Sequence, residues 1–200
     1  MKKVMLAALC FAILPSIVSA AVITPVAVDS SSTFPTYDQN NLIDGSGLSG
    51  GLHGTEYNTM WLNGSEGADG ELTFDLGGTY AITSSDIWQY NATCCGLDRG
   101  VKDFDILAST NGVDFTYITS ATLTRSPDGN SGIPAQNIAF ATTASYIRFD
   151  IQSNYGAQMY TGLSEVRFNG EPASITVPEP MSVLLIGLGL VGMGLIRKRS

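Results

Sequence analysis

The sequence predicts an all-β domain folded as a β-sandwich. Short runs of β-branched and aromatic residues, or of alternating apolar and polar residues, recur along the middle of the chain. Glycine and asparagine turn signals separate these runs, and no segment repeats its apolar residues with the 3.6-residue period of an amphipathic helix. Seven or eight such strands without a helix are typical of two packed antiparallel sheets.

The segments expected to be strands follow one another between residues 70 and 168. In chain order they are 70–76, 80–82 with 87–90, 101–108, 115–123, 137–141, 146–151 and 163–168. The run 147–151 alternates apolar and charged residues, as a sheet with one face on a core and one in water requires. Asn111-Gly112 is the pair that a type I′ hairpin turn prefers. Gly77-Gly78 and Asp128-Gly129 are expected to separate strands in the same way.

The charge of the chain excludes one class of partner. The 200 residues include 10 Lys and Arg against 18 Asp and Glu, for a formal net charge of −8, and half of the basic residues lie in the first three and last four positions. Because binding to phosphate backbones needs clustered basic side chains, we expect no nucleic-acid partner. An acidic domain of this kind suits divalent cations, neutral sugars or basic surfaces.

Residues 1–20 have the features of a secretory signal peptide. Lys2 and Lys3 precede the apolar run 4–17, and Val18-Ser19-Ala20 places small residues before the expected cleavage after Ala20. The alternative, a buried N-terminal helix, is disfavoured by the basic start and by Pro15.

The C-terminal residues 178–200 have three parts. Pro178-Glu179-Pro180 comes first, the uncharged apolar segment 181–196 follows, and basic residues 197–199 come just before the last residue. As a helix, the 16 apolar residues would extend roughly 24 Å, so a transmembrane helix here needs local bilayer thinning and snorkelling of the basic residues. The basic cluster predicts that this end stays in the cytoplasm and that the preceding domain faces outward.

This three-part order resembles the PEP-CTERM sorting signal of Gram-negative bacteria, which an exosortase recognises and cuts near the tripeptide. The resemblance implies a protein exported across the inner membrane to the cell envelope, cell surface or extracellular matrix. It also implies at least transient anchoring by a single transmembrane helix, signal peptidase and exosortase as partners during export, and an association with exopolysaccharide. The alternative is a permanent single-pass anchor.

The middle of the chain resembles the discoidin domain, also called the coagulation factor V/VIII type C domain. Six segments carry the resemblance in order: 41–45 (Asn-Leu-Ile-Asp-Gly), 71–77, 87–91, 101–112, 146–151 and 163–170. The resemblance implies an eight-stranded antiparallel jelly-roll β-sandwich of the galactose-binding-like group over residues 21–170. Residues 171–177 have no core-forming pattern and are expected to be a linker. Members of this group bind glycans, lipid headgroups or proteins, mostly through loops at one end of the sandwich, and rarely catalyse a reaction.

Two carboxylates are candidates for a structural calcium site. Asp44 lies in a glycine-rich turn and Glu165 near the start of the last expected strand, and the first and last strands of a sandwich are often neighbours. In the resembled family, calcium often uses the Asp of the Asn-Leu-x-Asp-Gly turn, nearby carbonyls and the Glu of the last strand. Carried over, the ligands are Asp44, Glu165 and carbonyls around Asn41 and Ser46, which are oxygen donors of the kind that Ca²⁺ takes. The glycine-rich stretch 45–51 departs from the family pattern. The alternative is a turn-capping Asp and a surface Glu.

Two loops combine aromatic rings with polar side chains. The candidate ligand-binding residues are Tyr90, Asn91, Arg99, Asn154, Tyr155, Gln158 and Tyr160. Sugar recognition needs this pairing, because the apolar face of a sugar stacks on a ring while its hydroxyls need fixed polar partners. The alternative is that the tyrosines are ordinary rim residues of the sandwich, half buried with the hydroxyl in water.

Cysteine and histidine are scarce. After removal of the signal peptide only Cys94 and Cys95 remain, and in an oxidising compartment they form either a vicinal disulfide or a bond to another chain. With His53 as the single histidine, neither a four-ligand zinc site nor a Ser-His-Asp arrangement is expected.

These observations predict a non-enzymatic, exported binding module that recognises polysaccharide or another surface component. The first alternative is a structural matrix protein without a defined ligand. The second, which we rank last, is a glycoside hydrolase that uses a pair of carboxylates.

Overall fold

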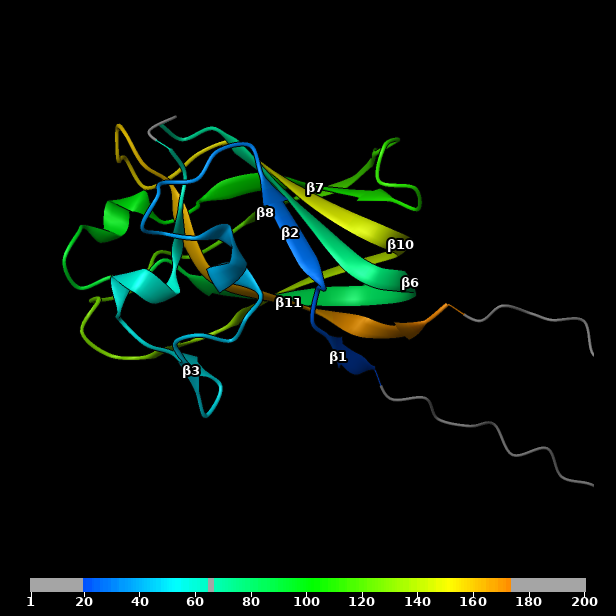
Figure 1. Cartoon of the computed structure of the whole chain (residues 1–200), viewed down its shortest axis with the longest axis horizontal. Coiled ribbons are helices and arrows are strands. Elements are labelled where there is room, and N and C mark those ends of the chain that lie inside the picture. The colour runs from blue at the N-terminus through cyan, green and yellow to red at the C-terminus, as the bar shows by residue number, and fades with distance from the viewer. Residues whose placement is uncertain (1–19, 65–66, 174–200) are drawn as a thin grey trace, which may run out of the picture.

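The computed structural model describes residues 20–64 and 67–173, and it confirms the all-β sandwich. The described residues form eleven strands and three short 3₁₀ helices (Figure 1). The strands are β1 (Ala21–Ile23), β2 (Ala27–Ser30), β3 (Leu48–Ser49), β4 (Leu52–His53), β5 (Trp61–Leu62), β6 (Gly70–Gln89), β7 (Asp103–Ser109), β8 (Thr116–Thr122), β9 (Ile133–Pro134), β10 (Gln136–Ile151) and β11 (Gly162–Pro172). The 3₁₀ helices are η1 (Gln39–Leu42), η2 (Tyr57–Thr59) and η3 (Leu97–Arg99).

Two long strands run through both layers of the sandwich. The main sheet has the order β1-β11-β6-β10-β7-β8, with β2 also pairing with β6 and β5 with β11, all antiparallel. The first part of β6 pairs with β2, and its second part pairs with β11. Strand β10 likewise pairs with β7 only over its second part. The paired strands β6 and β10 therefore connect the two layers, while β3, β4 and β9 form a separate small sheet.

Gly77 marks the bend of β6, which corrects the expectation that Gly77-Gly78 ends a strand. The register of β6 on β10 shifts between the pairs Ala144–Tyr80 and Tyr146–Asp75. Gly77 has φ +74°, and a Cβ atom there would lie 2.8 Å from the Val26 side chain. A bulge increases the local bend of a strand without ending it. The expected strands 70–76, 80–82 and 87–90 are consequently one strand, as are 137–141 and 146–151.

The connection between β7 and β8 also differs from the expected two-residue turn. Six residues separate the strands, and Gly112 has φ +75°. Ser109 Oγ accepts hydrogen bonds from the N–H groups of Asn111 and Gly112, and Asn111 Oδ1 accepts from those of Val113 and Asp114. These side-chain acceptors stabilise a longer loop, because each replaces a backbone partner that a tight hairpin would supply.

The core consists of two clusters. The larger cluster lies between the layers, where Phe74 of β6 packs on Phe149 of β10 and Phe168 of β11 with ring centroids 5.2 and 5.6 Å apart. The smaller cluster contains Tyr37, Met60, Leu62, Tyr90 and Ala92. Its apolar side chains support the loops at one end of the sandwich.

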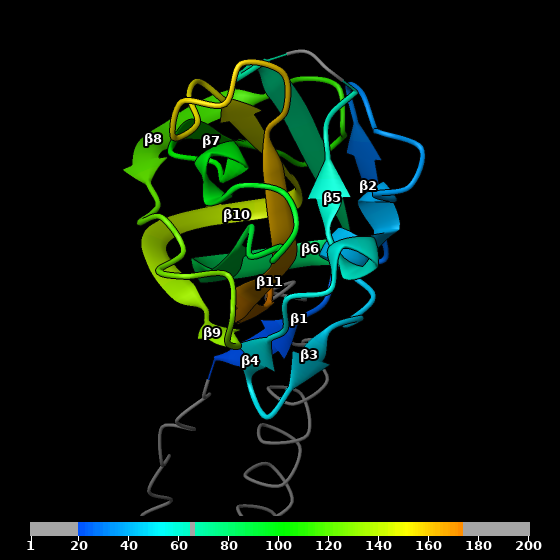
Figure 2. The same ribbon diagram turned by 90° about the vertical axis from the view of Figure 1, so that its left-hand side faces the viewer.

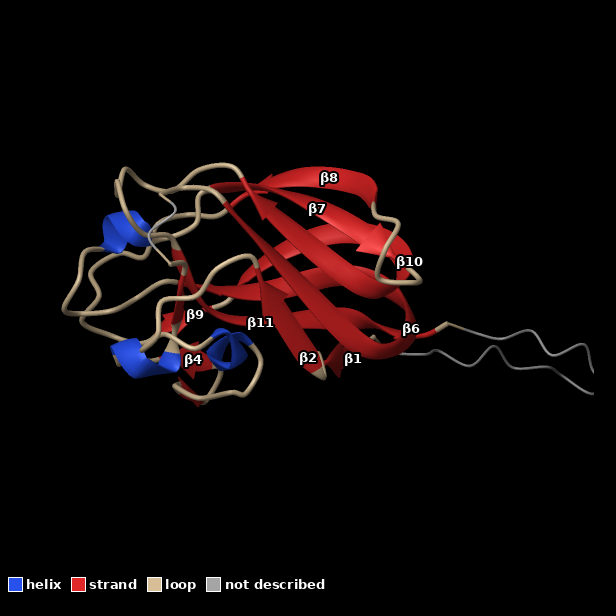
Figure 3. Ribbon diagram, turned by 45° about the horizontal axis from the view of Figure 1, so that its top comes forward, coloured by secondary structure: helices blue, strands red, loops and turns tan. Residues whose placement is uncertain are grey.

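The 3₁₀ helices and the long loops gather at that same end of the sandwich (Figure 3). Figure 2 looks onto it, with η3 in front of the strands and the loop before β11 above. Strand β1 pairs with the second half of β11, from Ala21 with Gly170 to Ile23 with Phe168. Strand β11 continues through Pro172, so the first two residues of the expected linker belong to the sheet.

The two terminal segments fall largely outside the described residues. These are the signal peptide, of which only Ala20 is described, the sorting motif Pro178-Glu179-Pro180 and the expected helix 181–196. Within residues 20–64 and 67–173, no helix is long and apolar enough to cross a membrane.

Candidate ligand-binding site

Two loops from distant parts of the sequence pack together beside η3. The Asp98 carbonyl accepts hydrogen bonds from the N–H groups of Tyr155, at 3.0 Å, and Ala157, at 3.4 Å. Asn154 Nδ2 closes the second loop on itself by donating to the carbonyls of Ala157 and Tyr160. The side chains that this pairing presents are therefore held by a continuous set of hydrogen bonds.

An open cleft of about 450 Å³ lies between these loops. Its lining residues are Cys95, Asp98, Arg99, Gly156, Ala157, Gln158, Met159 and Tyr160. A smaller cavity of about 190 Å³ adjoins it and is lined by Phe34, Tyr37, Leu62, Arg99 and Tyr160. Arg99 and Tyr160 line both, so the two cavities form one surface.

Aromatic rings build the apolar side of this surface. The Phe34 ring packs edge-on against Tyr160 and Tyr37, with centroids 5.5 and 5.9 Å apart, and Tyr37 packs on Tyr57 at 5.5 Å. The Arg99 guanidinium lies 4.9 Å from the centroid of the Tyr160 ring. Flat rings beside amide, carboxylate and guanidinium groups can bind a ligand that has both an apolar face and hydroxyl groups.

The electrostatics of the site centre on Arg99. Among the described residues, no carboxylate lies within ion-pair distance of its guanidinium. The Tyr90 hydroxyl lies beneath the surface, where burial raises its pKa above the usual range; Tyr37 adds to this shift and Arg99 opposes it. Tyr90 therefore stays neutral and adds no negative charge beneath Arg99, whose guanidinium forms no ion pair within the described residues.

Tyr90 and Asn91 require a correction, because the structure buries both residues completely. Tyr90 belongs to the smaller core cluster. Asn91 Nδ2 donates to the carbonyls of Gly54 and Ser131, and its Oδ1 accepts from Ser126 Oγ. Both side chains support the loops from below and have no surface with which to contact a ligand.

The other five candidate residues divide between lining the cleft and shaping its loop. Arg99, Gln158 and Tyr160 line the cleft. Asn154 and Tyr155 shape the loop: the Asn154 amide closes it, and the Tyr155 hydroxyl donates to the Leu123 carbonyl.

Sequence patterns did not indicate several residues that the structure places in the lining. Four of these carry side chains suited to ligand contact, and they are Phe34, Tyr37, Asp98 and Met159. Their positions follow from the packing of loops against one another, which leaves no periodic signal in the sequence.

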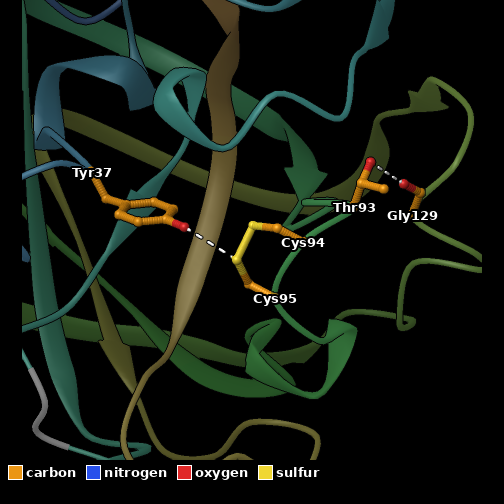
Figure 4. Close-up of a disulfide and its surroundings, with 5 residues drawn as sticks. All are labelled: Tyr37, Thr93, Cys94, Cys95 and Gly129. Carbon is orange, nitrogen blue, oxygen red and sulfur yellow. Dashed lines mark hydrogen bonds between the residues drawn. A yellow bond between two sulfur atoms is a disulfide. The ribbon is translucent and has the colours of Figure 1, made fainter.

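Cys94 and Cys95 are joined in a vicinal disulfide at the edge of the cleft (Figure 4). The Tyr37 hydroxyl lies 3.6 Å from Cys95 Sγ. The bridge thus connects the cleft to the neighbouring aromatic cavity.

The candidate calcium ligands lie on the side of the domain where η1 meets β11. The Glu165 side chain is fully buried, its Oε2 accepts the Gly45 N–H at 3.1 Å, and its Oε1 pairs with the Arg167 guanidinium. Burial raises the pKa of Glu165 to about 7; Arg167 and the Gly45 N–H oppose this shift, and the charge of Asp44 adds to it. The alternative of an ordinary surface Glu is therefore wrong.

Asp44 and Ser46 lie together in the turn that follows η1. Asp44 is exposed, and its Oδ1 accepts the Ser46 N–H at 2.7 Å. Ser46 Oγ is buried without a hydrogen-bond partner among the described residues. The Asn41 side-chain amide is already engaged, because it donates to the carbonyls of Asn58 and Met60.

The candidate ligand atoms are of the chemical type that calcium binds, but they are few. They are oxygen atoms from a turn and from a buried carboxylate, which Ca²⁺ accepts. No three His, Cys, Asp or Glu side chains of the described ranges are grouped as a metal site. In addition, Arg167 competes with any cation for Glu165.

Comparison with known families decides the identity of the fold. A sequence model described as the F5/8 type C domain matches residues 27–166. The chain belongs to the F5/8 type C domain family. A second model, the PEP-CTERM protein-sorting motif, matches residues 176–199 and indicates an exported protein of the cell envelope. A comparison with curated proteins finds no match.

Solved structures similar to this F5/8 type C domain include carbohydrate-binding modules of family 32. CpGH89CBM32-5 from Clostridium perfringens, in complex with GalNAc-β-1,3-galactose, has a TM-score of 0.57 at 16% identity, over 74% of this chain and 99% of that one. The family 32 module of C. perfringens NanJ, in complex with galactose, has a TM-score of 0.55 at 19% identity, over 76% of this chain and 98% of that one. The family 32 module of AlyQ, in complex with 4,5-unsaturated mannuronic acid, has a TM-score of 0.55 at 24% identity, over 74% of this chain and 97% of that one. At these identities the likeness establishes the galactose-binding-like fold.

Proposed function

We propose that this F5/8 type C domain binds a glycan of the cell envelope or extracellular matrix through the cleft between η3 and the loop 152–161. The observation that carries the proposal is the Arg99 guanidinium over the Tyr160 ring, on the surface shared by both cavities. An aromatic side chain at a cleft offers a platform for the C–H face of a sugar, and a guanidinium donates hydrogen bonds to its hydroxyls.

The residues that line the cleft support binding of a glycan without catalysis. Glycoside hydrolysis in its usual form needs two carboxyl groups on either side of the scissile bond. Within the described residues, Asp98 is the single carboxylate that lines the cleft. Similar solved domains are binding modules, which agrees with this proposal. The alternative is a structural matrix protein without a ligand, and a glycan array distinguishes it from a glycan-binding module.

A glycan array tests the proposal. The full chain, purified in a detergent without a sugar headgroup, is applied to glycans that end in neutral hexoses, N-acetylhexosamines and uronates. We expect selective capture by the wild type, loss of capture by Arg99→Ala, and unchanged capture by Arg125→Ala, which removes an exposed arginine outside the cleft. A wild type that folds but captures none of these glycans overturns the proposal and favours a structural matrix role.

We further propose that the turn around Asp44 holds a structural calcium ion. Asp44, Glu165, and the Asn41 and Ser46 carbonyls would supply oxygen ligands, as predicted from the family. The support is a buried Ser46 Oγ without a partner among the described residues and a fully buried carboxylate in Glu165 next to the charge of Asp44. A bound cation would offset the repulsion between the two carboxylates.

The proposed localisation follows from the ends of the chain. The PEP-CTERM motif supports recognition by an exosortase after export and cleavage by signal peptidase. The helix 181–196 would anchor the domain to the inner membrane until that step. The domain would then act at the cell surface or in the matrix, where polysaccharide is available.

A further inference from the structure

The Cys94–Cys95 disulfide contributes little to the stability of the whole domain. A disulfide stabilises mainly by restricting the unfolded chain, and the effect grows with the number of residues in the loop that it closes. Cys94 and Cys95 are consecutive, so their bridge closes no loop of intervening residues. The bridge must therefore act locally, on the segment between β6 and η3.

The bridge lies where the two cavities meet. Cys95 lines the cleft together with Arg99 and Tyr160. On its other side, Cys95 Sγ contacts the hydroxyl of Tyr37, which lines the aromatic cavity. The Cys94 side of the bridge is exposed to solvent.

Residues next to the bridge anchor its backbone independently of the sulfur atoms. Thr93 Oγ1 donates to the Gly129 carbonyl at 2.7 Å (Figure 4). The Thr93 N–H donates to the Thr55 carbonyl at 3.4 Å. Gly96 follows with φ +85°, a left-handed conformation that favours glycine. The chain is thus anchored before the bridge and turns sharply after it, which directs the disulfide toward Tyr37 and the cleft.

A disulfide is chemically suited to contact the apolar C–H face of a sugar ring. Its two sulfur atoms are polarisable, accept hydrogen bonds only weakly and donate none, so they favour contact with C–H groups. Met159 adds a second sulfur side chain to the same lining and is 55% exposed. The polar members of the lining, Asp98, Arg99 and Gln158, remain available for hydroxyl groups.

We propose that the Cys94–Cys95 disulfide is itself a binding element of the cleft and packs against the C–H face of a bound sugar ring. This inference rests on the proposed function, because it assigns a contact within the same glycan site. Reduction replaces the compact bridge by two separate thiols, and substitution by serine replaces it by two hydroxyl groups, so in both cases the contact surface of the bridge is lost.

The test uses the strongest binder from the glycan array and isothermal titration of the full chain. We expect the double variant Cys94→Ser/Cys95→Ser to bind about tenfold more weakly, a loss of roughly 1.4 kcal/mol, with a melting temperature close to that of the wild type. The serine hydroxyls keep the size of the side chains close to that of the cysteines, so the variant removes the S–S bond without opening a large cavity.

Reduction of the wild type gives a second, independent measurement. Treatment with a dithiol should weaken binding to the same extent as the double variant. The dithiol breaks the S–S bond, leaves two thiols and is itself oxidised to a disulfide. The chain has three cysteines and two of them form this bridge, so Cys10 has no cysteine left to pair with and within one chain the dithiol acts on this bridge alone.

A structure of the complex distinguishes direct contact between the disulfide and the sugar from an indirect effect of the disulfide on the shape of its loop. We expect ring carbons of the sugar within about 4 Å of the Cys94 or Cys95 sulfur, which is the distance of direct packing. Equal affinity of the double variant, or a sugar bound without contact to either sulfur, overturns the inference while leaving the proposed function intact. A wild type that captures no glycan overturns both.

Discussion

The guanidinium of Arg99 lies over the ring of Tyr160, 4.9 Å from its centroid, although the two residues are far apart in the sequence. Arg99 ends η3, and Tyr160 immediately precedes the buried Thr161 that leads into β11. The contact orders a long side chain and a ring on one surface before any ligand arrives. A site arranged in advance loses less conformational entropy on binding.

Arg99→Lys should weaken glycan capture several-fold. Lysine keeps the positive charge but lacks the planar group that stacks on a ring, and an exposed cation–π contact contributes about 0.5–1 kcal/mol. Titration of the array's strongest binder measures the change, with Arg125→Lys as the matched control. Equal affinity of Arg99→Lys and the wild type would show that charge alone matters.

Tyr155 and Tyr160 should respond differently to substitution. Tyr160→Ala should abolish capture with a moderate fall in melting temperature, because its half-buried ring lines the cleft and also packs against the smaller core cluster. Tyr155→Phe should lower the free energy of unfolding by about 1 kcal/mol, since it removes the hydrogen bond to the Leu123 carbonyl, and should leave capture unchanged. Denaturant unfolding and the array together measure both effects. A large loss of stability in Tyr160→Ala would assign its ring to the core.

Pro178→Ala/Pro180→Ala should block processing of the C-terminal segment. The apolar residues 181–196 are untouched, so membrane insertion should continue while recognition of the tripeptide is lost. Fractionation and immunoblotting should detect full-length protein that accumulates in the membrane. Unchanged mobility and location of the variant would identify the segment as a permanent anchor.

A calcium chelator should lower the melting temperature of the wild type by several degrees. An ion that binds only the folded state stabilises it by about 2.7 kcal/mol when its free concentration is about a hundred times the dissociation constant. Asp44→Asn should melt lower in calcium and respond little to chelation. Magnesium should rescue poorly, because it requires a tight octahedral shell.

Asp44→Asn is the informative calcium variant, since Glu165→Gln also removes the partner of the Arg167 guanidinium. Removal of one member of a buried pair is destabilising by itself. Identical melting curves of the wild type in chelator and in millimolar calcium would show that Asp44 is only a turn residue.

Acid should destabilise the domain through His53. The His53 side chain is fully buried, and this burial lowers its pKa below the ordinary value, so at neutral pH the folded protein keeps the ring neutral. The unfolded chain takes up a proton below about pH 6.5, and the stability contributed by the neutral ring is therefore complete above that pH and declines below it. Between about pH 7.5 and 5.5 we expect a loss of up to about 1.4 kcal/mol relative to His53→Gln.

The comparison with His53→Gln is necessary because Glu165 titrates in the opposite direction. Its raised pKa of about 7 means that the folded protein binds the extra proton, so this group favours the folded state as the pH falls from 7 toward 4.5. Denaturant unfolding of both proteins at the two pH values isolates the histidine. Parallel pH profiles would contradict a neutral, buried His53.

Local patterns determined most of what the sequence revealed about this fold. The alternation in 147–151 predicted a strand correctly, because a strand side chain points to one face or the other according to its own position. The family and the sorting motif were also recognisable, since short ordered segments carry both. Asp44 and Glu165 do lie close together, but through the turn after η1, where the Gly45 N–H donates to Glu165 Oε2, and not through the pairing of β1 with β11.

Tertiary structure alone decided how strands join and which loop residues reach the surface. Gly77 bends β6 without ending it, because Val26 from a distant part of the chain packs where a side chain would be. Tyr90 and Asn91 are buried because loops from elsewhere in the chain cover the end of β6, whereas Phe34 and Tyr37 are brought to the cleft.

These positions depend on contacts between segments that are remote in sequence. The hydrogen bonds from Tyr155 and Ala157 to the Asp98 carbonyl fix the loop that carries Tyr160, and they join residues on two separate connections of the sandwich. A period of two or of 3.6 residues reports only which face of its own element a side chain occupies. The sequence therefore determined the sandwich fold and the sorting motif near the C-terminus, while the packing of loops on loops decided which residues form the cleft.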